Sequence, residues 1–158
     1  MSTLHHASCP TAIVKAPIEA VWQLLPDPGR WDEFFDVRRV TVTPPGTASV
    51  GQVVRAESGP RLLRLKISFQ FLEIEETRHR LLINVDLPLG IMVREDLNCI
   101  RLEKDQCRVN YGCNFEFPNG WRGVLARLFL HKEIDAGPAD SLFRLKRRAE
   151  QLHANART

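Results

Sequence analysis

The sequence predicts an α+β fold in which a curved antiparallel β-sheet wraps around one long C-terminal helix, with two short helices after the first strand. Two patterns indicate this fold. Apolar and polar residues alternate between residues 40 and 117, and helical periodicity is confined to residues 17–35 and to the stretch from residue 121 onward. The chain has 158 residues, 44% of them hydrophobic, and no repeat or linker divides it. Residues 1–158 are therefore expected to form a single domain with one core.

The N-terminal part is expected to hold a strand around residues 12–15, preceded by a mobile terminus and followed directly by two short helices. Pro17 suits the first position of a helix, because its fixed φ matches and no donor is lost. Pro26 ends that helix, and Asp27 and Pro28 begin the next as cap and first-turn residue. The apolar residues share one face of each helix: Ile18, Val21, Leu24 and Leu25 in the first, Trp31, Phe34 and Phe35 in the second.

Alternation predicts six strands, at residues 40–42, 50–56, 63–75, 81–87, 91–102 and 107–117. In the third of these the inner face shifts from Phe71 to Leu72, which predicts a bulge or sharp bend there, since a slip of one residue exchanges the two faces. The inner face of that strand begins with Leu63. A second shift, to Ile100 and Leu102, is expected in the fifth strand.

Residues from 121 onward predict helix. One apolar face is continuous at helical spacing through Trp121, Val124, Leu125, Leu128, Leu142, Leu145, Ala149 and Leu152. Gly137-Pro138 predicts a kink or short break within it. A curved sheet that grips such a helix buries both elements and can leave a cavity between them.

The order of these elements resembles the helix-grip superfamily, which includes START-like domains, polyketide cyclase/dehydrase-like proteins and plant Bet v 1-type allergens. The resemblance is carried by residues 13–22 (IVKAPIEAVW), 27–31 (DPGRW) and 139–150 (ADSLFRLKRRAE), and the order of elements extends it over nearly the whole chain. It implies a site between sheet and helix for a lipid, sterol, polyketide or plant hormone. A minority of such proteins catalyse cyclisation or dehydration.

Glu95 is the residue that most directly indicates chemistry. Strict alternation places it on the inner face with Val93 and Leu97, where a carboxylate is costly unless it is hydrogen-bonded, and where burial raises its pKa. It is thus a candidate polar anchor or general acid, and Tyr111 on a neighbouring strand could be its partner. The alternative is that a bulge turns Glu95 outward to pair with Arg94 or Arg101.

A ligand in the cavity is expected to contact large apolar side chains together with this polar pair. Core packing alone is the alternative explanation for any one of the apolar residues. The predicted ligand-binding residues are Trp31, Phe35, Phe69, Phe71, Val85, Glu95, Tyr111, Phe115, Leu125 and Leu128, with Glu95 and Tyr111 as the candidate catalytic residues.

Several classes of function are disfavoured. The net charge of +3 is too small to favour nucleic acid, and no apolar run approaches the roughly 20 residues that span a bilayer. The first residues lack the pattern of a signal peptide, so a cytoplasmic location is expected. No phosphate loop or dinucleotide motif is present, and no cofactor is expected.

The cysteines and histidines indicate no metal site. Cys9, Cys99, Cys107 and Cys113 have no CxxC spacing and are expected to be inert thiols in the core. His131 and Asp135 are four residues apart on a helix, but the sequence offers no third ligand beside them.

Three functions remain open. The leading hypothesis is non-catalytic binding of a small hydrophobic molecule, such as a lipid, polyketide or isoprenoid-like compound. The second is an enzyme of the polyketide cyclase or dehydratase type that uses general acid–base catalysis. The third is a protein-interaction module that engages an acidic partner or an anionic membrane surface through the basic run Lys146, Arg147 and Arg148, which is otherwise a solvated helix face.

Overall fold

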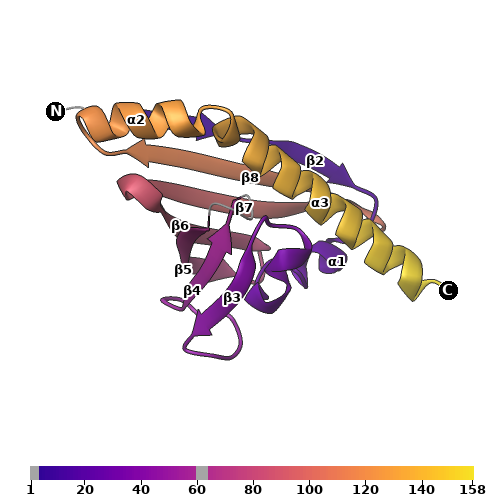
Figure 1. Ribbon diagram of the computed structural model, residues 1–158. Helices are drawn as coiled ribbons and strands as arrows, with labels where there is room; N and C mark the ends of the chain where they lie inside the picture. Colours follow the sequence, from indigo (N-terminus) through magenta and orange to yellow (C-terminus); the bar gives the residue numbers. More distant parts are fainter. Residues whose placement is uncertain (1–3, 60–63) are drawn as a thin grey trace.

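A computed structural model describes residues 4–59 and 64–158. Its strands form one curved antiparallel sheet in the order β1-β8-β7-β6-β5-β4-β3, and β2 also pairs with β8. Helix α3 crosses one face of this sheet diagonally (Figure 1). The strands are β1 (Leu4–Ser8), β2 (Thr11–Val14), β3 (Arg38–Thr43), β4 (Val53–Ser58), β5 (Leu65–Glu75), β6 (Arg80–Leu87), β7 (Ile91–Glu103) and β8 (Gln106–Phe117). The helices are α1 (Ile18–Trp22), η1 (Pro28–Glu33), η2 (Pro88–Gly90), α2 (Trp121–Leu130) and α3 (Glu133–Ala156).

The predicted fold class is confirmed, and so is the bulge in β5. The register between β5 and β6 shifts between Phe71 and Glu73, where the alternation of the sequence changes phase. Leu63, predicted at the start of this inner face, lies outside the described residues. The second predicted phase shift is wrong. β7 stays in register with β8 as far as Arg101, so Ile100 faces outward and is exposed. Leu102, at a register shift between Arg101 and Glu103, is exposed as well.

The N-terminal segment is more ordered than predicted. Residues 4–8 form β1, which pairs with β8 in a register that places His6 opposite Phe115. β1 and β2 thus lie end to end along the same strand, with Cys9 between them. Cys9 is exposed, so the prediction of a core thiol is wrong there, whereas the other three cysteines are buried and unpaired as expected.

The corner between the first two helices closes one end of the sheet. The Asp27 side chain caps η1 by accepting a hydrogen bond from the Gly29 amide at 3.1 Å. Trp31 is fully buried, and its indole N–H donates to the Leu25 carbonyl at 2.9 Å. The predicted cap, start and buried face of this segment are confirmed, although it is a 3₁₀ helix.

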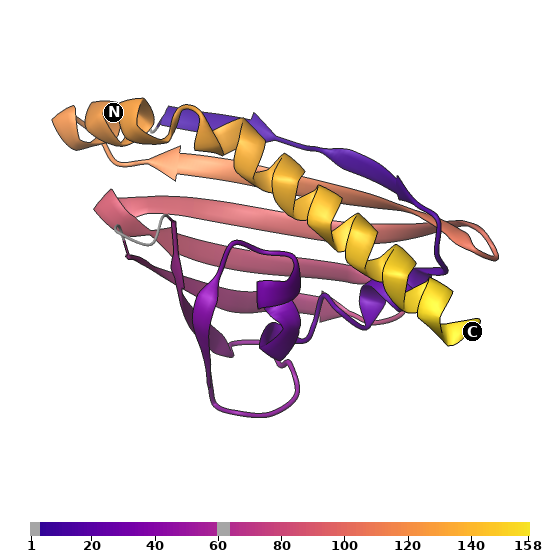
Figure 2. The ribbon, with the colours of Figure 1, turned by 45° about the vertical axis from the view of Figure 1, so that its right-hand side comes forward.

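The C-terminal helix breaks earlier than predicted. α2 ends at Leu130 and α3 begins at Glu133, and Pro138 lies inside α3. The chain changes direction between the two helices (Figure 2). A proline in the second turn removes one backbone hydrogen bond, and here it does not end the helix. The buried face of α3 is the predicted one, with Leu142, Leu145 and Ala149 against the sheet. No helix in the described residues has the length and apolar character needed to cross a membrane.

The predicted apolar face of the C-terminal segment is wrong in its first half, which covers residues 121–128. Leu125 and Leu128 are exposed on α2, as are Trp121 and Val124. α2 and α3 are separate helices, so the apolar stripe of α3 does not continue along α2. The small residues Gly123 and Ala126 form the buried side of α2 instead.

Candidate functional site

Glu95 lies in the middle of the sheet on its inner face. β7 pairs with both neighbours in regular register at this point, which places Glu95 between Ile83 of β6 and Cys113 of β8. Only 8% of its surface is accessible, and Val93 and Leu97 on the same face are buried too. The expectation of an inward carboxylate is confirmed, and the alternative of an outward bulge is wrong.

Tyr111 is the hydrogen-bond partner of this carboxylate. Its hydroxyl donates to Glu95 Oε1 at 2.8 Å, and the two groups are buried together. Glu95 Oε2 is also buried and has no hydrogen-bond partner among residues 4–59 and 64–158. A buried polar atom without a partner is uncommon and costly, so this oxygen marks a place where a further polar group would be stabilised.

Burial sets the protonation of this pair. It raises the pKa of Glu95 to about 7, and the hydrogen bond from Tyr111 opposes this effect in part. The pKa of Tyr111 is raised well above its ordinary value, by burial and by the charge of Glu95. Tyr111 therefore remains the donor near neutral pH, and Glu95 changes between a carboxylic acid and a carboxylate.

An aromatic cluster adjoins the polar pair. The ring of Phe35 lies 6.2 Å from that of Tyr111, measured between centroids, and 5.4 Å from that of Trp31. Trp31 also contacts the rings of Phe69, at 5.0 Å, and Phe71, at 5.6 Å. The corner of η1 thus brings its aromatic residues onto the inner faces of β5 and β8, next to the carboxylate.

The other predicted sheet residues form a neighbouring row across the sheet. Phe69 of β5, Val85 of β6 and Phe115 of β8 lie in one row, which Val93 of β7, not among the predicted residues, completes. All four are buried. Eight of the ten residues predicted to contact a ligand are therefore buried in this interior, and the remaining two, Leu125 and Leu128, lie apart from it on α2.

The inner-face side chains differ slightly in how completely they are buried. Phe35, Phe69, Glu95 and Phe115 keep between 5% and 8% of their surface accessible, whereas Trp31 and Phe71 keep 0% and 1%. Glu95 and these three aromatic side chains are therefore slightly less completely buried than Trp31 and Phe71.

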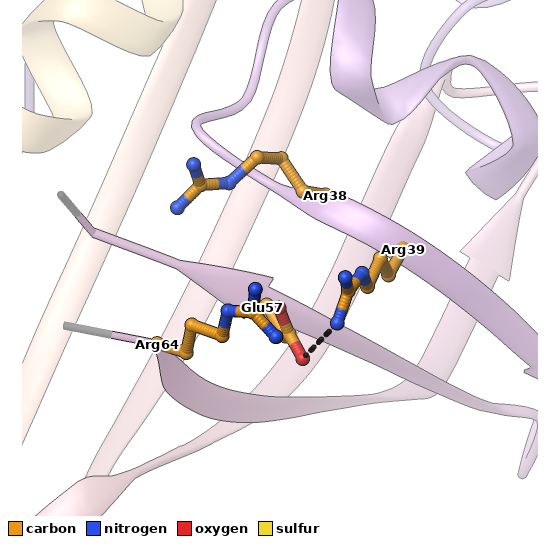
Figure 3. A pocket seen from close by; sticks show the side chains of 4 residues that line it. All are labelled: Arg38, Arg39, Glu57 and Arg64. Carbon is orange, nitrogen blue, oxygen red and sulfur yellow. Dashed lines mark hydrogen bonds and ion pairs between the residues drawn. The ribbon is translucent and has the colours of Figure 1, made fainter. Parts of the chain in front are cut away.

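Two hollows on the surface are separate from this interior. One, of about 290 Å³, lies at the β3–β4 edge and is lined by Arg38, Arg39, Glu57 and Arg64 (Figure 3). Arg39 donates to Glu57 there at 3.3 Å. The other, of about 600 Å³, lies beside α2. Neither hollow is apparent from the sequence, because each is formed by side chains from more than one element of the fold.

Several titratable residues outside the interior are engaged in ion pairs. Asp135, considered with His131 for a metal site, instead lies 3.1 Å from His6 Nε2. Within the described parts of the chain, no three His, Cys, Asp or Glu side chains are grouped closely enough to hold a metal ion. Arg148 pairs with Glu33 of η1, so this member of the basic run joins the η1 corner to α3.

Comparison with known proteins agrees with this arrangement. A family model described as polyketide cyclase/dehydrase and lipid transport matches residues 10–150. The chain belongs to this family. The match extends from the residue before β2 to the last turns of α3, and so includes every strand that carries the interior site. No curated protein matches the sequence at a significant level.

Solved structures show the same helix-grip fold as this member of the polyketide cyclase/dehydrase family. The Zhui aromatase/cyclase of a Streptomyces species superposes with a TM-score of 0.78 at 18% identity, covering 94% of this chain and 95% of that one. Norcoclaurine synthase from Thalictrum flavum superposes with a TM-score of 0.74 at 13% identity, covering 100% and 99%. A Thermus thermophilus protein superposes with a TM-score of 0.71 at 16% identity, covering 93% of this chain and 99% of that one.

Proposed function

We propose that this protein binds a small, mostly apolar molecule between the sheet and α3, and that the molecule carries an oxygen that contacts Glu95. The observation that carries the proposal is Glu95 Oε2, a buried carboxyl oxygen that no hydrogen-bond donor of the described residues reaches, on an inner face lined by aromatic side chains. Ligand sites of this kind are mostly apolar with a few placed polar groups. Membership of a family described by polyketide and lipid chemistry supports the same class of ligand.

The protonation of Glu95 predicts which oxygen it prefers. Below its pKa of about 7, Glu95 accepts a hydrogen bond from Tyr111 on Oε1 and can donate its own proton from Oε2. A ketone or ester oxygen, which only accepts, fits that donor. Above the pKa the ionised carboxylate loses this hydrogen bond, and an apolar ligand that excludes water from the carboxylate makes its charge still more costly.

The experiment that tests the proposal is calorimetric titration with β-ionone, a small apolar isoprenoid ketone, at pH 6 and pH 8.5. We expect wild-type protein to bind it at pH 6 and to lose about tenfold in affinity at pH 8.5, the effect of one hydrogen bond. Glu95→Gln, whose amide donates at both pH values, should bind equally at both. Glu95→Leu should bind about tenfold more weakly than wild type at pH 6.

The control variants separate this interior from the α2 surface, where an apolar probe could also bind. Leu125→Ser and Leu128→Ser lie outside the interior and should leave the affinity and its pH dependence unchanged. Absence of binding at both pH values, together with no small molecule retained in native mass spectra of the freshly purified protein, would contradict the proposal. So would binding that is equal in wild type and Glu95→Leu.

Acid–base catalysis is the second candidate, and the pairing of Glu95 with Tyr111 favours it. Two polar groups converge on one wall, and a pKa of about 7 allows Glu95 to take up and release a proton near neutral pH. In the dehydration of a β-hydroxy ketone, the Glu95 carboxylate would remove the proton next to the ketone. The hydroxyl then leaves as water, taking up the proton that Glu95 removed, and a conjugated ketone and the Glu95 carboxylate remain.

Ultraviolet absorbance with diacetone alcohol as substrate tests this candidate. Catalysis predicts formation of the conjugated product, and a loss of about 10²- to 10⁴-fold in rate in Glu95→Gln, since an amide cannot remove the proton. Equal rates with wild type, Glu95→Gln and buffer would leave the binding proposal standing and reject catalysis of this reaction.

A further inference from the structure

Helix α2 turns an apolar face away from the protein. Its buried residues, Gly123 and Ala126, lie on one side of the helix, and Leu130 on the same side is partly buried. At about 100° per residue, the five large apolar residues occupy an arc of about 140° on the opposite side. These are Trp121, Val124, Leu125, Leu128 and Phe129, and between 53% and 71% of each is exposed.

The charged residues of α2 are both arginines, and they lie at the two borders of this apolar face. Arg122 lies at one border of the apolar arc and Arg127 at the other, and residues 121–132 contain no acidic residue. His131 and Lys132 follow directly. The guanidinium of Arg122 stands over the Trp121 ring at 5.7 Å, so its stem already lies along apolar surface. Arginines at the borders of an apolar face can keep their charged groups in the polar layer while the face enters a bilayer interface.

The structure around α2 extends the apolar surface. α2 contacts η2, where Leu89 is 55% exposed at a φ of +68°. The hollow of about 600 Å³ beside α2 is lined by Leu4, Val124 and Leu128, with Arg127 and His131 among its other residues. Both views show α2 at one extremity of the molecule, remote from the C-terminal end of α3 (Figures 1 and 2).

We propose that α2 docks this protein onto the surface of a membrane that contains anionic lipids. A helix with a broad apolar face, an aromatic residue at its start and only basic charges at its borders fits the headgroup and acyl boundary of such a membrane. The alternative occupant, a second copy of the chain, fits less well. In a two-fold dimer through α2 the arginines of both copies would approach one another, and the helix has no acidic residue to pair with them.

The proposal is independent of the interior site, because it uses none of the residues that contact Glu95. It assigns to the protein a surface through which an apolar ligand could be exchanged with a lipid bilayer. Loss of ligand binding in a Glu95 variant would therefore leave membrane docking intact, and the two proposals fail separately.

Vesicle flotation and tryptophan fluorescence test the docking. Trp121 is 71% exposed, whereas Trp22 and Trp31 are buried, so insertion of α2 changes the emission of Trp121 selectively. We expect wild-type protein to float with vesicles of phosphatidylcholine and phosphatidylglycerol, with a blue-shifted emission that acrylamide quenches less. Binding to pure phosphatidylcholine should be weaker and less sensitive to salt.

Two double variants on α2 and one control define the surface. Leu125→Ser with Leu128→Ser should lower vesicle affinity by at least about tenfold, by removing apolar area. Arg122→Glu with Arg127→Glu should abolish the preference for anionic vesicles. The control is Ile100→Ser with Leu102→Ser, two exposed residues near the β7–β8 hairpin, at the far end of β8 from α2, and it should bind as wild type does.

Circular dichroism checks that each variant is folded, which is expected because all the substituted side chains are exposed. The proposal is overturned if wild-type protein does not float with anionic vesicles, or if the α2 variants float as well as the control. It is also overturned if sedimentation shows a dimer without vesicles that the Leu125→Ser, Leu128→Ser variant dissociates, since α2 would then be covered by a second copy.

Discussion

The Glu95→Gln substitution should change how stability depends on pH. Glu95 has a pKa of about 7 in the folded protein and a reference value of 4.5 when exposed. An acid whose pKa is raised by folding binds its proton more tightly in the folded state. Its contribution to the free energy of unfolding is therefore fully present below pH 4.5 and is lost as the pH rises through about 7.

The size of this effect follows from the two pKa values. Their difference of about 2.5 corresponds to about 3 kcal/mol, at 1.4 kcal/mol for each pH unit. Glu95→Gln, which carries no titrating group there, should match wild type within about 1 kcal/mol at pH 5. At pH 8.5 it should be more stable than wild type by about 3 kcal/mol, or roughly 6 to 12 °C in Tm.

Urea unfolding followed by circular dichroism at pH 5, 6, 7 and 8.5 measures this difference. Subtracting the variant's free energy of unfolding from that of wild type at each pH cancels the contribution of every other titrating group. Tyr111→Phe is the second variant: it removes the hydrogen bond that lowers the pKa of Glu95, so the loss of stability should move to a higher pH. A difference between wild type and Glu95→Gln that stays constant from pH 5 to 8.5 would refute the reasoning.

Three further outcomes test the packing. Gly123→Ala should destabilise the protein by about 1 to 3 kcal/mol, because the added Cβ would lie 1.9 Å from the backbone carbonyl oxygen of Pro118. Gly137→Ala, with open space around the added Cβ, should stabilise α3 by about 0.5 to 1 kcal/mol in the same unfolding assay. Trp31→Ala should cost about 3 to 5 kcal/mol and Trp121→Ala about 0.5 kcal/mol or less, and equal costs would contradict the burial of Trp31. In a thiol titration of the folded protein, Cys9 alone of the four cysteines should react quickly, and rapid reaction of all four would show that the strands open.

The sheet and its polar pair could be predicted because a strand has a period of two. That period alone decides which residues share a face, so a carboxylate among inward residues was visible in the alternation around Glu95. The same rule located the bulge after Phe71. The period of two also places Tyr111 on the inner face of β8, and the hydrogen bond between Tyr111 and Glu95 confirms that both strands present these residues inward.

The surroundings of the helices could not be predicted in the same way. Helical periodicity shows that Leu125 and Leu128 share a face, but it does not show whether that face meets the sheet or solvent. The break after Leu130 has no proline or glycine to mark it, so the sequence pattern predicts the break at Gly137-Pro138 instead. β1 was missed because its sequence, LHHAS, has little apolar alternation, and its pairing with β8 depends on contacts more than 100 residues away.

The proposal of a ligand beside Glu95 is tested most directly by a crystal structure of the protein purified without any step that removes bound small molecules. We predict continuous density between the sheet and α3 with one end within hydrogen-bond distance of Glu95 Oε2, next to the rings of Phe35 and Tyr111. An interior closed entirely by the protein's own side chains, with no density at Oε2, would contradict the account.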